Sequence, residues 1–161
     1  MKKNSCHAKG MKQAILSARK GIRKSEGGPF GAAIFKNGKP MAVAHNTVLQ
    51  YQDATCHAEI NAIRIASKKM KNFDLSGCVI YSTNEPCPMC FSAIHWARIR
   101  EVIFGTKIRD VQERGFHELS ISSDQMKSRG KSPVRLRAGF MRKECLGLLK
   151  EWDRKENKKV Y

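Results

Sequence analysis

The feature that most constrains how this chain can fold is a pair of short motifs rich in metal-binding side chains. Cys56-His57-Ala58-Glu59 is followed, about thirty residues later, by Pro86-Cys87-Pro88-Met89-Cys90. Together the motifs offer one imidazole and two thiolates, which are preferred ligands of zinc. A fold that uses this pattern must bring two segments that are distant in the sequence close together in space.

Three protein ligands are typical of a catalytic zinc site, because a closed structural site has four. His57, Cys87 and Cys90 would be the ligands, with one zinc ion per chain. Glu59, two residues beyond the histidine, would be free to carry protons. The alternative is a closed structural site with a fourth ligand, for which the sequence offers Cys56, His95 or His117.

The spacing of the two cysteines predicts that they share one face of a helix. Cys87 and Cys90 are three residues apart, and Pro88 suits the first turn, where its missing N–H costs nothing. The positive end of the helix dipole would lower the pKa of both thiols and favour the thiolates that zinc requires. Because the ligands come from two segments, removing the metal should reduce stability as well as activity.

Length and cysteine usage indicate one domain in a reducing compartment. At 161 residues the chain can bury a core of its own, so we expect a single domain over 1–161. No apolar run approaches the ~20 residues that span a bilayer, and we expect no membrane contact and a cytoplasmic location. Two of the six cysteines belong to the metal motif, and the other four are scattered, as is ordinary for free thiols.

The formal net charge is +17, and it is concentrated in two segments. Residues 1–25 hold eight basic side chains and no acid, and residues 126–143 hold seven basic side chains and no acid. Such a charge attracts polyanions, so RNA is a possible partner. The alternative is a solvated basic face without a specific partner. Few aromatic residues interleave with these blocks, so the sequence leaves their role open.

Apolar periodicity and turn residues predict an alternation of helices and strands. Helices are expected at 6–25, 56–71, 87–98 and 142–155, and strands at 30–36, 41–44, 78–82, 102–105 and 134–138. Residues 106–132 show no clear pattern. The order of elements predicts an α/β fold, a three-layer α/β/α sandwich with a central, mostly mixed sheet of five strands.

The joint pattern H-x-E followed by P-C-x-x-C is typical of zinc-dependent nucleobase deaminases. The chain resembles the cytidine/deoxycytidylate deaminase superfamily and, within it, is most similar to the bacterial guanine deaminases. The likeness to guanine deaminases extends beyond the zinc motif to Gly28-Pro29-Phe30-Gly31, Asn46, Ala93-Ile94-His95-Trp96-Ala97-Arg98, Gly115-Phe116 and Asn157-Lys158-Lys159-Val160-Tyr161.

This resemblance implies a cytidine deaminase-like fold and the hydrolytic deamination of a purine base, guanine to xanthine plus ammonia. Zinc would lower the pKa of a water from about 16 to ~7, and Glu59 would pass protons to the ring and the departing amine. Residues implied to bind the base are Phe30, Asn46, Ala58, Trp96, Glu118 and Tyr161.

The resemblance also implies how these residues act. Phe30 and Trp96 would line the base pocket, and Asn46 would hydrogen-bond the ring. Glu118 would accept protons from the N1–H and the 2-amino group of guanine, which rejects adenine because its corresponding edge presents an acceptor. Tyr161 would close over the substrate from the partner subunit of a homodimer in which residues 140–161 are exchanged.

Two alternatives remain at this point. A tRNA-specific adenosine deaminase, which converts adenosine to inosine in an anticodon loop, would also contain His57-Ala58-Glu59-Ile60-Asn61-Ala62 and would suit the charge of +17. A non-catalytic zinc protein could bind nucleic acid through the basic blocks, although the intact Glu59 argues against it.

Overall fold

A computed structural model describes residues 2–161; Met1 and the side chains of residues 2–5, which belong to the basic segment 1–25, lie outside the description. The helices are α1 (Lys2–Lys24), α2 (Val48–Tyr51), α3 (Ala58–Met70), α4 (Pro88–Trp96), α5 (Ile108–Gln112), α6 (Ser123–Arg129) and α7 (Arg142–Asp153). The strands are β1 (Gly31–Lys36), β2 (Lys39–His45), β3 (Cys78–Asn84), β4 (Glu101–Thr106) and β5 (Arg135–Arg137).

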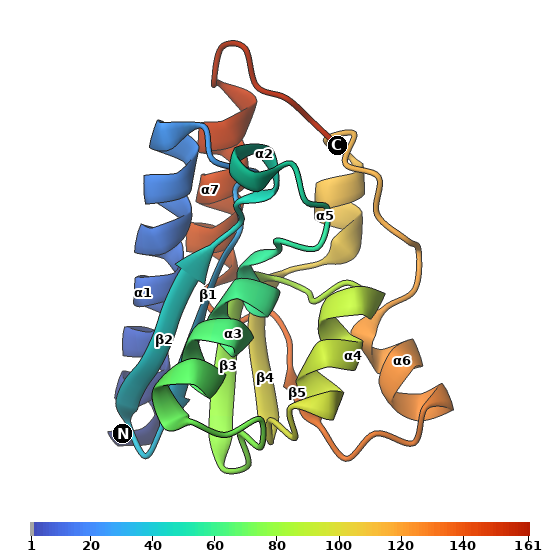
Figure 1. Cartoon of the computed structure of the whole chain (residues 1–161). Helices are drawn as coiled ribbons and strands as arrows, with labels where there is room; N and C mark the ends of the chain where they lie inside the picture. Colours follow the sequence, from blue (N-terminus) through green and yellow to red (C-terminus); the bar gives the residue numbers. More distant parts are fainter. Residues whose placement is uncertain (1) are drawn as a thin grey trace.

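The strands form one mixed sheet of five strands in the order β2-β1-β3-β4-β5. β1 runs antiparallel to both β2 and β3, whereas β3, β4 and β5 are parallel. Helices α3 and α4 cover one face, and α1 and α7 cover the other (Figure 1). The predicted three-layer α/β/α sandwich is confirmed, and no helix in the described part of the chain is long and apolar enough to cross a membrane.

The core lies in two layers because the central strands are apolar on both faces. In β1, Ala32 and Ile34 pack toward α3 and α4, whereas Ala33 and Phe35 pack toward α1 and α7. This alternation follows from the two-residue period of a strand. A strand buried on both sides reads as a continuous apolar run, which is why the sequence predicts it well.

The short helices are the part of the fold that the sequence analysis did not predict. α2 lies between β2 and α3, where no element was expected, and α5 and α6 lie in 106–132. α6 has a visible sequence signal: the Ser122 hydroxyl accepts from the Gln125 N–H at 3.1 Å, and the Gln125 side chain accepts from the Ser122 N–H at 2.9 Å. This capping box stabilises α6, which with seven residues is too short to be stable without such contacts.

One end of the sheet collects every segment that carries a predicted metal ligand. The carboxyl end of β3 leads into α4, the start of α3 lies beside it, and β1 begins at the same end. The Gly31 N–H at the start of β1 donates to Thr83 Oγ1 at 3.0 Å and ties the two strands together there. Ligand sites of open α/β sheets lie at such an edge.

Gly31 provides a test of this packing. A Cβ built at Gly31 would lie 2.0 Å from the backbone oxygen of Ala14 in α1, so Gly31→Ala must push the helix away from the sheet. We expect a loss of about 1–3 kcal/mol of stability and, at ~2–4 °C per kcal/mol, a clear fall in melting temperature. The matched control is Gly147→Ala in α7, where a Cβ meets nothing within 4 Å.

The control should stabilise the protein, by up to ~1 kcal/mol, because alanine favours a helix more than glycine does. Both variants can be compared by thermal unfolding followed by circular dichroism. Equal melting temperatures for Gly31→Ala and the wild type would contradict the close approach of α1 to β1.

Candidate active site

Three potential metal ligands converge at this end of the sheet. One donor atom each from His57, Cys87 and Cys90 lies within 4.8 Å of the others. Among the described residues, these three form the group of His, Cys, Asp or Glu side chains that could hold a metal ion. The two cysteine sulfurs lie 3.6 Å and 3.5 Å from His57 Nδ1, for Cys87 and Cys90 respectively. The predicted ligand set is therefore brought together in space.

These distances fit zinc. Bonds of about 2.1 Å to nitrogen and about 2.3 Å to sulfur, at a tetrahedral angle, separate the two donors by about 3.6 Å. The soft, borderline character of the donor set also suits zinc better than magnesium or calcium, which prefer oxygen. The His/Cys/Cys group thus suits one zinc ion per chain.

The local structure explains why the ligands face one another. His57 and Cys87 are the residues directly before α3 and α4, each with extended backbone, and Cys90 lies in the first turn of α4. Pro88 opens α4, where no N–H is required. The parallel pair β3 and β4 and the helix α3 hold the two helix starts side by side (Figure 1).

The three candidates for a fourth ligand lie elsewhere. The Cys56 thiol donates to Asp53 Oδ2 at 3.4 Å, and His95 Nδ1 lies 2.9 Å from the Ser132 hydroxyl. Neither side chain, nor that of His117, belongs to the metal-binding group found among residues that the structure describes.

The electrostatics of the two thiols are those of a metal-binding pair. The pKa of Cys87 is lowered to about 4, first by the side chain of Cys90 and then, against the effect of burial, by His57. The pKa of Cys90 is raised, because its hydrogen bond to Cys87 and its burial both favour the thiol. A divalent cation bound by both sulfurs would favour two thiolates.

Glu59 points into the same space from the first turn of α3. Its Oε1 accepts from the Ser82 hydroxyl at 3.0 Å, and its Oε2 lies 3.5 Å from the Cys90 sulfur. Burial, and then the charge of Cys87, raise its pKa above the usual carboxyl value. The geometry therefore holds a carboxyl group beside the metal ligands without making it one of them.

A small cavity opens beside the metal ligands, with a volume of about 20 Å³. It is lined by Phe30, Asn46, His57, Glu59, Asn84, Glu85, Cys87 and Glu118. We call it the site cavity. Its walls contain three carboxyl groups and no lysine or arginine, although the chain carries a net charge of +17.

Asn46 presents an unused hydrogen-bond donor at the site cavity. The residue is fully buried, and its Oδ1 accepts from the Val48 N–H at 3.1 Å and from the Tyr161 hydroxyl at 2.5 Å. Its Nδ2 has no hydrogen-bond partner. Because a buried donor without a partner is costly, this amide is suited to bind an acceptor of a ligand.

The C-terminal tail packs beside the site cavity of its own chain. It runs from the end of α7 across to α5 (Figure 1), and the hydroxyl of the last residue, Tyr161, accepts from the Gly28 N–H at 2.9 Å. The Tyr161 ring packs edge-on against Phe116, with centroids 5.5 Å apart. The sequence analysis expected this tyrosine from a partner subunit, whereas here the contacts are made within one chain; exchange of 140–161 stays a prediction.

Glu118 reaches the site cavity from the loop between α5 and α6. Burial, and then the negative charge of Cys87, raise its pKa to about 7. Its backbone oxygen accepts from Gln112 Nε2 at 3.2 Å, which steadies the loop. The least readable segment of the sequence therefore supplies one wall of the pocket.

Three of the residues implied to bind the base do not line the site cavity. Trp96 is 79% exposed at the end of α4 and lines a separate, larger hollow, Ala58 is the buried first residue of α3, and Tyr161 contacts Asn46 beside the cavity. The lining residues that sequence reasoning missed are Asn84, the last residue of β3, and Glu85, which follows it and precedes the metal-binding cysteines. Their position directly before Pro86 was the available signal.

Comparison with known proteins agrees with this site. Residues 4–106 match the family described as the cytidine and deoxycytidylate deaminase zinc-binding region. The guanine deaminase of Bacillus subtilis is 41% identical over 112 residues, which cover 70% of this chain and 72% of that one. The tRNA-specific adenosine deaminase of the same organism is 33% identical over 149 residues, covering 92% of this chain and 89% of the other.

A solved structure of guanine deaminase from Nitrosomonas europaea is similar in fold. It is 29% identical in sequence and superposes with a TM-score of 0.81 over 88% of this chain and 81% of that one.

Metal removal should destabilise the fold, since the ligands join α3 to α4. A site saturated at ~100 times its dissociation constant contributes about 2.7 kcal/mol, so a strong chelator should lower the melting temperature by roughly 5–10 °C. The Cys90→Ser variant is the control, because it should melt at the same temperature with and without chelator. A wild-type melting temperature that is the same with and without the chelator would contradict a metal ion that joins α3 to α4.

Proposed function

The chain belongs to the cytidine and deoxycytidylate deaminase family and is a zinc-dependent aminohydrolase, and from this premise we propose that it deaminates guanine to xanthine and ammonia. Family membership also removes the third alternative, a zinc protein without catalysis. The choice of guanine rests chiefly on the acidic lining of the site cavity.

The substrate proposal is supported by the pattern of donors and acceptors around the site cavity. Glu118 offers a buried carboxylate acceptor, which suits the N1–H and 2-amino donors of guanine. Asn46 Nδ2 offers a free donor, which suits an acceptor atom on the same ring. Adenine presents an acceptor where guanine presents N1–H and would leave the carboxylate unpaired, at a cost of several kcal/mol.

The chemistry needs a nucleophile and a proton carrier. His57, Cys87 and Cys90 would hold a zinc ion, which would supply an activated water near neutral pH. Glu59 takes a proton from the attacking water and delivers protons to the ring nitrogen and the departing amine. One carbon–oxygen bond forms, one carbon–nitrogen bond breaks, and ammonia leaves. Ser82 holds Glu59 in place through its hydroxyl, 3.0 Å from Oε1.

The tail supports a small substrate. Tyr161 bonds Gly28 and Asn46 beside the site cavity, whose volume of about 20 Å³ is too small for a purine, so we infer that the base enters when the tail moves and is enclosed when it returns. Phe30 lines the site cavity and supplies flat apolar surface for the base, and Phe116 supports its ring, with centroids 5.1 Å apart. A polynucleotide could not be enclosed in this way.

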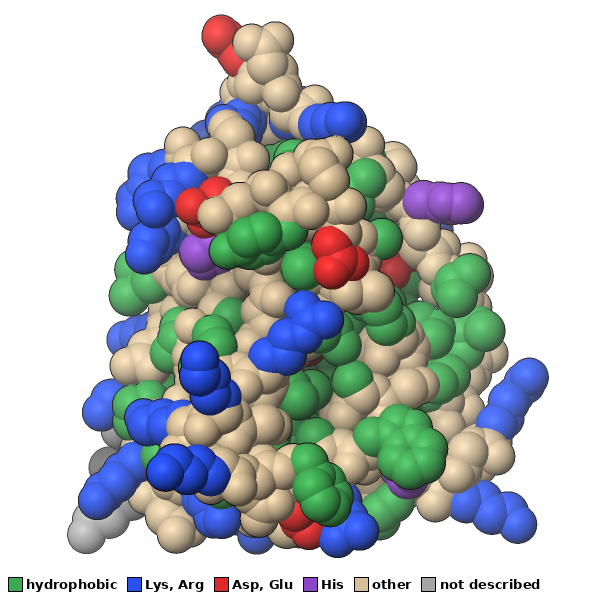
Figure 2. All heavy atoms as spheres, in the orientation of Figure 1, with side chains coloured by type: hydrophobic (Ala, Val, Ile, Leu, Met, Phe, Trp, Pro, Cys, Tyr) green, Lys and Arg blue, Asp and Glu red, His purple; other side chains and the backbone are tan. Residues whose placement is uncertain are grey.

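A tRNA adenosine deaminase is the second candidate, and the charge favours it. Lys and Arg side chains gather over α1 and along the lower edge of the molecule, whereas Asp and Glu are sparse on this face (Figure 2). The tRNA-specific adenosine deaminase of Bacillus subtilis also aligns over more of the chain than the guanine deaminase of that organism does, 92% against 70%. The basic surface suits RNA, although the acidic site cavity does not suit a phosphate.

We also propose that the enzyme is a cytoplasmic homodimer. The six cysteines, all within the described residues, are free, as in a reducing compartment. The larger hollow, about 990 Å³, is lined largely by apolar side chains that include exposed Phe73 and Trp96, and a second copy could cover it. An exchanged tail, residues 140–161, could make the contacts that Tyr161 makes here.

The substrate is tested by measuring ammonia release from guanine, adenine, adenosine and an anticodon stem-loop. Guanine should be the substrate, and Glu118→Gln should lower kcat/KM for guanine about 10- to 100-fold, because the charged acceptor is lost. Glu113→Gln, an exposed change in the same segment, is the matched control. Glu59→Gln should keep its zinc and lose turnover of every substrate.

Salt-sensitive formation of inosine in the stem-loop, without turnover of guanine, would favour the second candidate. An unchanged kcat/KM for guanine in Glu118→Gln would contradict the role of Glu118 in selecting guanine, but not the deaminase activity itself.

The lid is tested with Tyr161→Phe, which removes the hydroxyl that bonds Gly28 and Asn46. We expect KM for guanine to rise about 5- to 10-fold, as for the loss of roughly 1 kcal/mol of hydrogen bonding. Tyr51→Phe, on an exposed tyrosine, is the control. Steady-state kinetics measure KM for both variants. Equal KM values for Tyr161→Phe and the wild type would contradict a role of the tail in binding guanine.

A further inference from the structure

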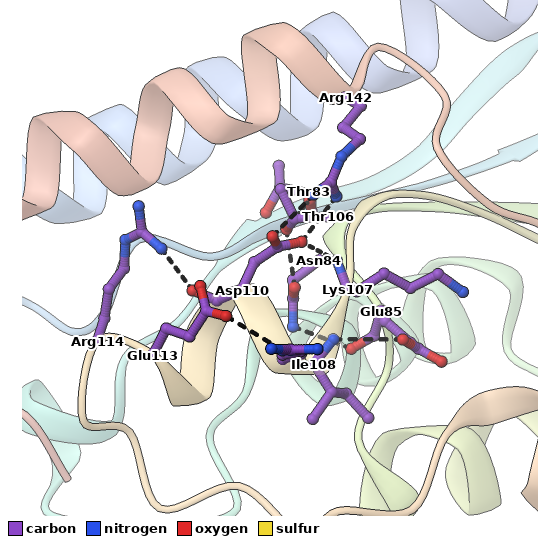
Figure 3. A network of polar contacts seen from close by, with 11 residues as sticks. Thr83, Asn84, Glu85, Thr106, Lys107, Ile108, Asp110, Glu113, Arg114 and Arg142 are labelled. Carbon is purple, nitrogen blue, oxygen red and sulfur yellow. Dashed lines mark hydrogen bonds and ion pairs between the residues drawn. The ribbon is translucent and has the colours of Figure 1, made fainter.

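The carboxylate of Glu85 has an unusual position for a group with no part in metal binding. It is 3% exposed and lies between the end of β3 and the metal-binding cysteines. Its two oxygens bind two backbone N–H groups that are far apart in sequence. Oε2 accepts from Ile108 at 3.2 Å, as Figure 3 shows, and Oε1 accepts from Ser123 at 2.9 Å.

These two N–H groups mark the two ends of one segment. Ile108 begins α5 and Ser123 begins α6, and the loop between these helices carries Phe116 and Glu118. We call residues 108–123 the specificity segment. Ser123 is fully buried, and its hydroxyl donates to the backbone oxygen of Pro86 at 3.0 Å. One side chain therefore fixes both ends of the segment that supplies a wall of the site cavity.

The other side of the segment is fixed independently. Arg142 of α7 donates to both oxygens of Asp110 in α5, at 2.7 Å and 2.8 Å (Figure 3). Arg114 pairs with Asp153, also of α7, at 3.1 Å. These contacts hold α5 against α7, on the face remote from the metal ligands. The segment is connected to the metal-binding end of the sheet by the two hydrogen bonds of Glu85 and by the one from Ser123 to Pro86.

The backbone of Glu85 connects the specificity segment to the sheet and to the metal ligands. Its N–H donates to the Thr106 oxygen at 2.8 Å, so it continues the pairing of β3 with β4. Two residues further on, Cys87 belongs to the metal-binding group. The same short stretch of chain thus carries a metal ligand at one end and the anchor of the specificity segment at the other.

We propose that Glu85 is a positioning residue for substrate specificity, which sets the place of Glu118 relative to the metal ligands by holding both ends of the specificity segment. The proposal rests on the proposed function, in which Glu118 binds the base. Two anchors are needed because a loop fixed at one end could move its carboxylate away from the ring, and small misplacements weaken binding strongly.

The sharpest variant is Glu85→Gln, which keeps the shape but loses one acceptor. An amide has a single oxygen, so its NH₂ group would face one of the two N–H donors. Glu85→Asp is the conservative variant, since it keeps both acceptors on a shorter side chain. Glu101→Gln is the matched control, because this carboxylate pairs with Arg135 at 3.3 Å near the other end of β4.

Three measurements on the full zinc-loaded chain separate the possible roles. Hydrogen exchange of peptides covering 107–123 reports the anchoring, zinc content reports the metal site, and kinetics with guanine report the specificity. We expect Glu85→Gln to keep one zinc, to speed exchange in this segment, and to raise KM about 10-fold with a smaller change in kcat. Glu85→Asp should lie between this variant and the wild type, and Glu101→Gln should match the wild type.

A double variant shows whether Glu85 acts through Glu118. If it does, Glu85→Gln should change KM far less in the Glu118→Gln background than in the wild type, because the effects of two coupled residues are not additive. Fully additive effects, unchanged exchange over 107–123, or loss of zinc as the main change would overturn the proposal. If the wild type does not deaminate guanine, the proposed function fails, and hydrogen exchange alone decides whether Glu85 anchors the segment.

Discussion

The meeting of one imidazole nitrogen with two cysteine sulfurs is the contact on which the rest of the structure depends. His57 precedes α3 and Cys87 precedes α4, so the two helix starts must lie side by side at the carboxyl end of β3. The parallel pairing of β3 with β4 and the packing of α3 on the sheet provide this arrangement. Glu59 then lies beside the metal ligands because it is two residues from His57, and the site cavity opens next to them.

The site cavity has a charge opposite to that of the protein around it. Three carboxyl groups and the metal-binding thiols lie within a chain of net charge +17, and the described lining has no lysine or arginine. Such a pocket retains a divalent cation and favours a ligand that presents hydrogen-bond donors. The basic exterior attracts polyanions at long range but cannot select among bases. Surface charge and pocket charge therefore bear on different steps of recognition.

The sequence predicted the parts whose information is local or carried by a motif. The five strands, the four long helices and the ligands His57, Cys87 and Cys90 all follow from periodicity or spacing. The anchoring contacts of Glu85 could not be found in this way, because its partners Ile108 and Ser123 are close to it only in three dimensions. Trp96 shows the opposite limit: a resemblance implied a place in the pocket, and the helix leaves its side chain exposed.

In the proposed function, the catalytic groups and two of the groups that bind the base, Glu118 and Tyr161, lie in different parts of the chain. The family match ends at residue 106 and includes the metal ligands, Glu59 and Asn46. Glu118 and Tyr161 lie beyond it, on a loop and a tail that have little regular structure of their own. Membership of the family therefore determines the reaction but not the base. A rigid connection between the two parts is then a physical requirement, and Glu85, in the matched region but bonded to the segment outside it, is placed to provide one.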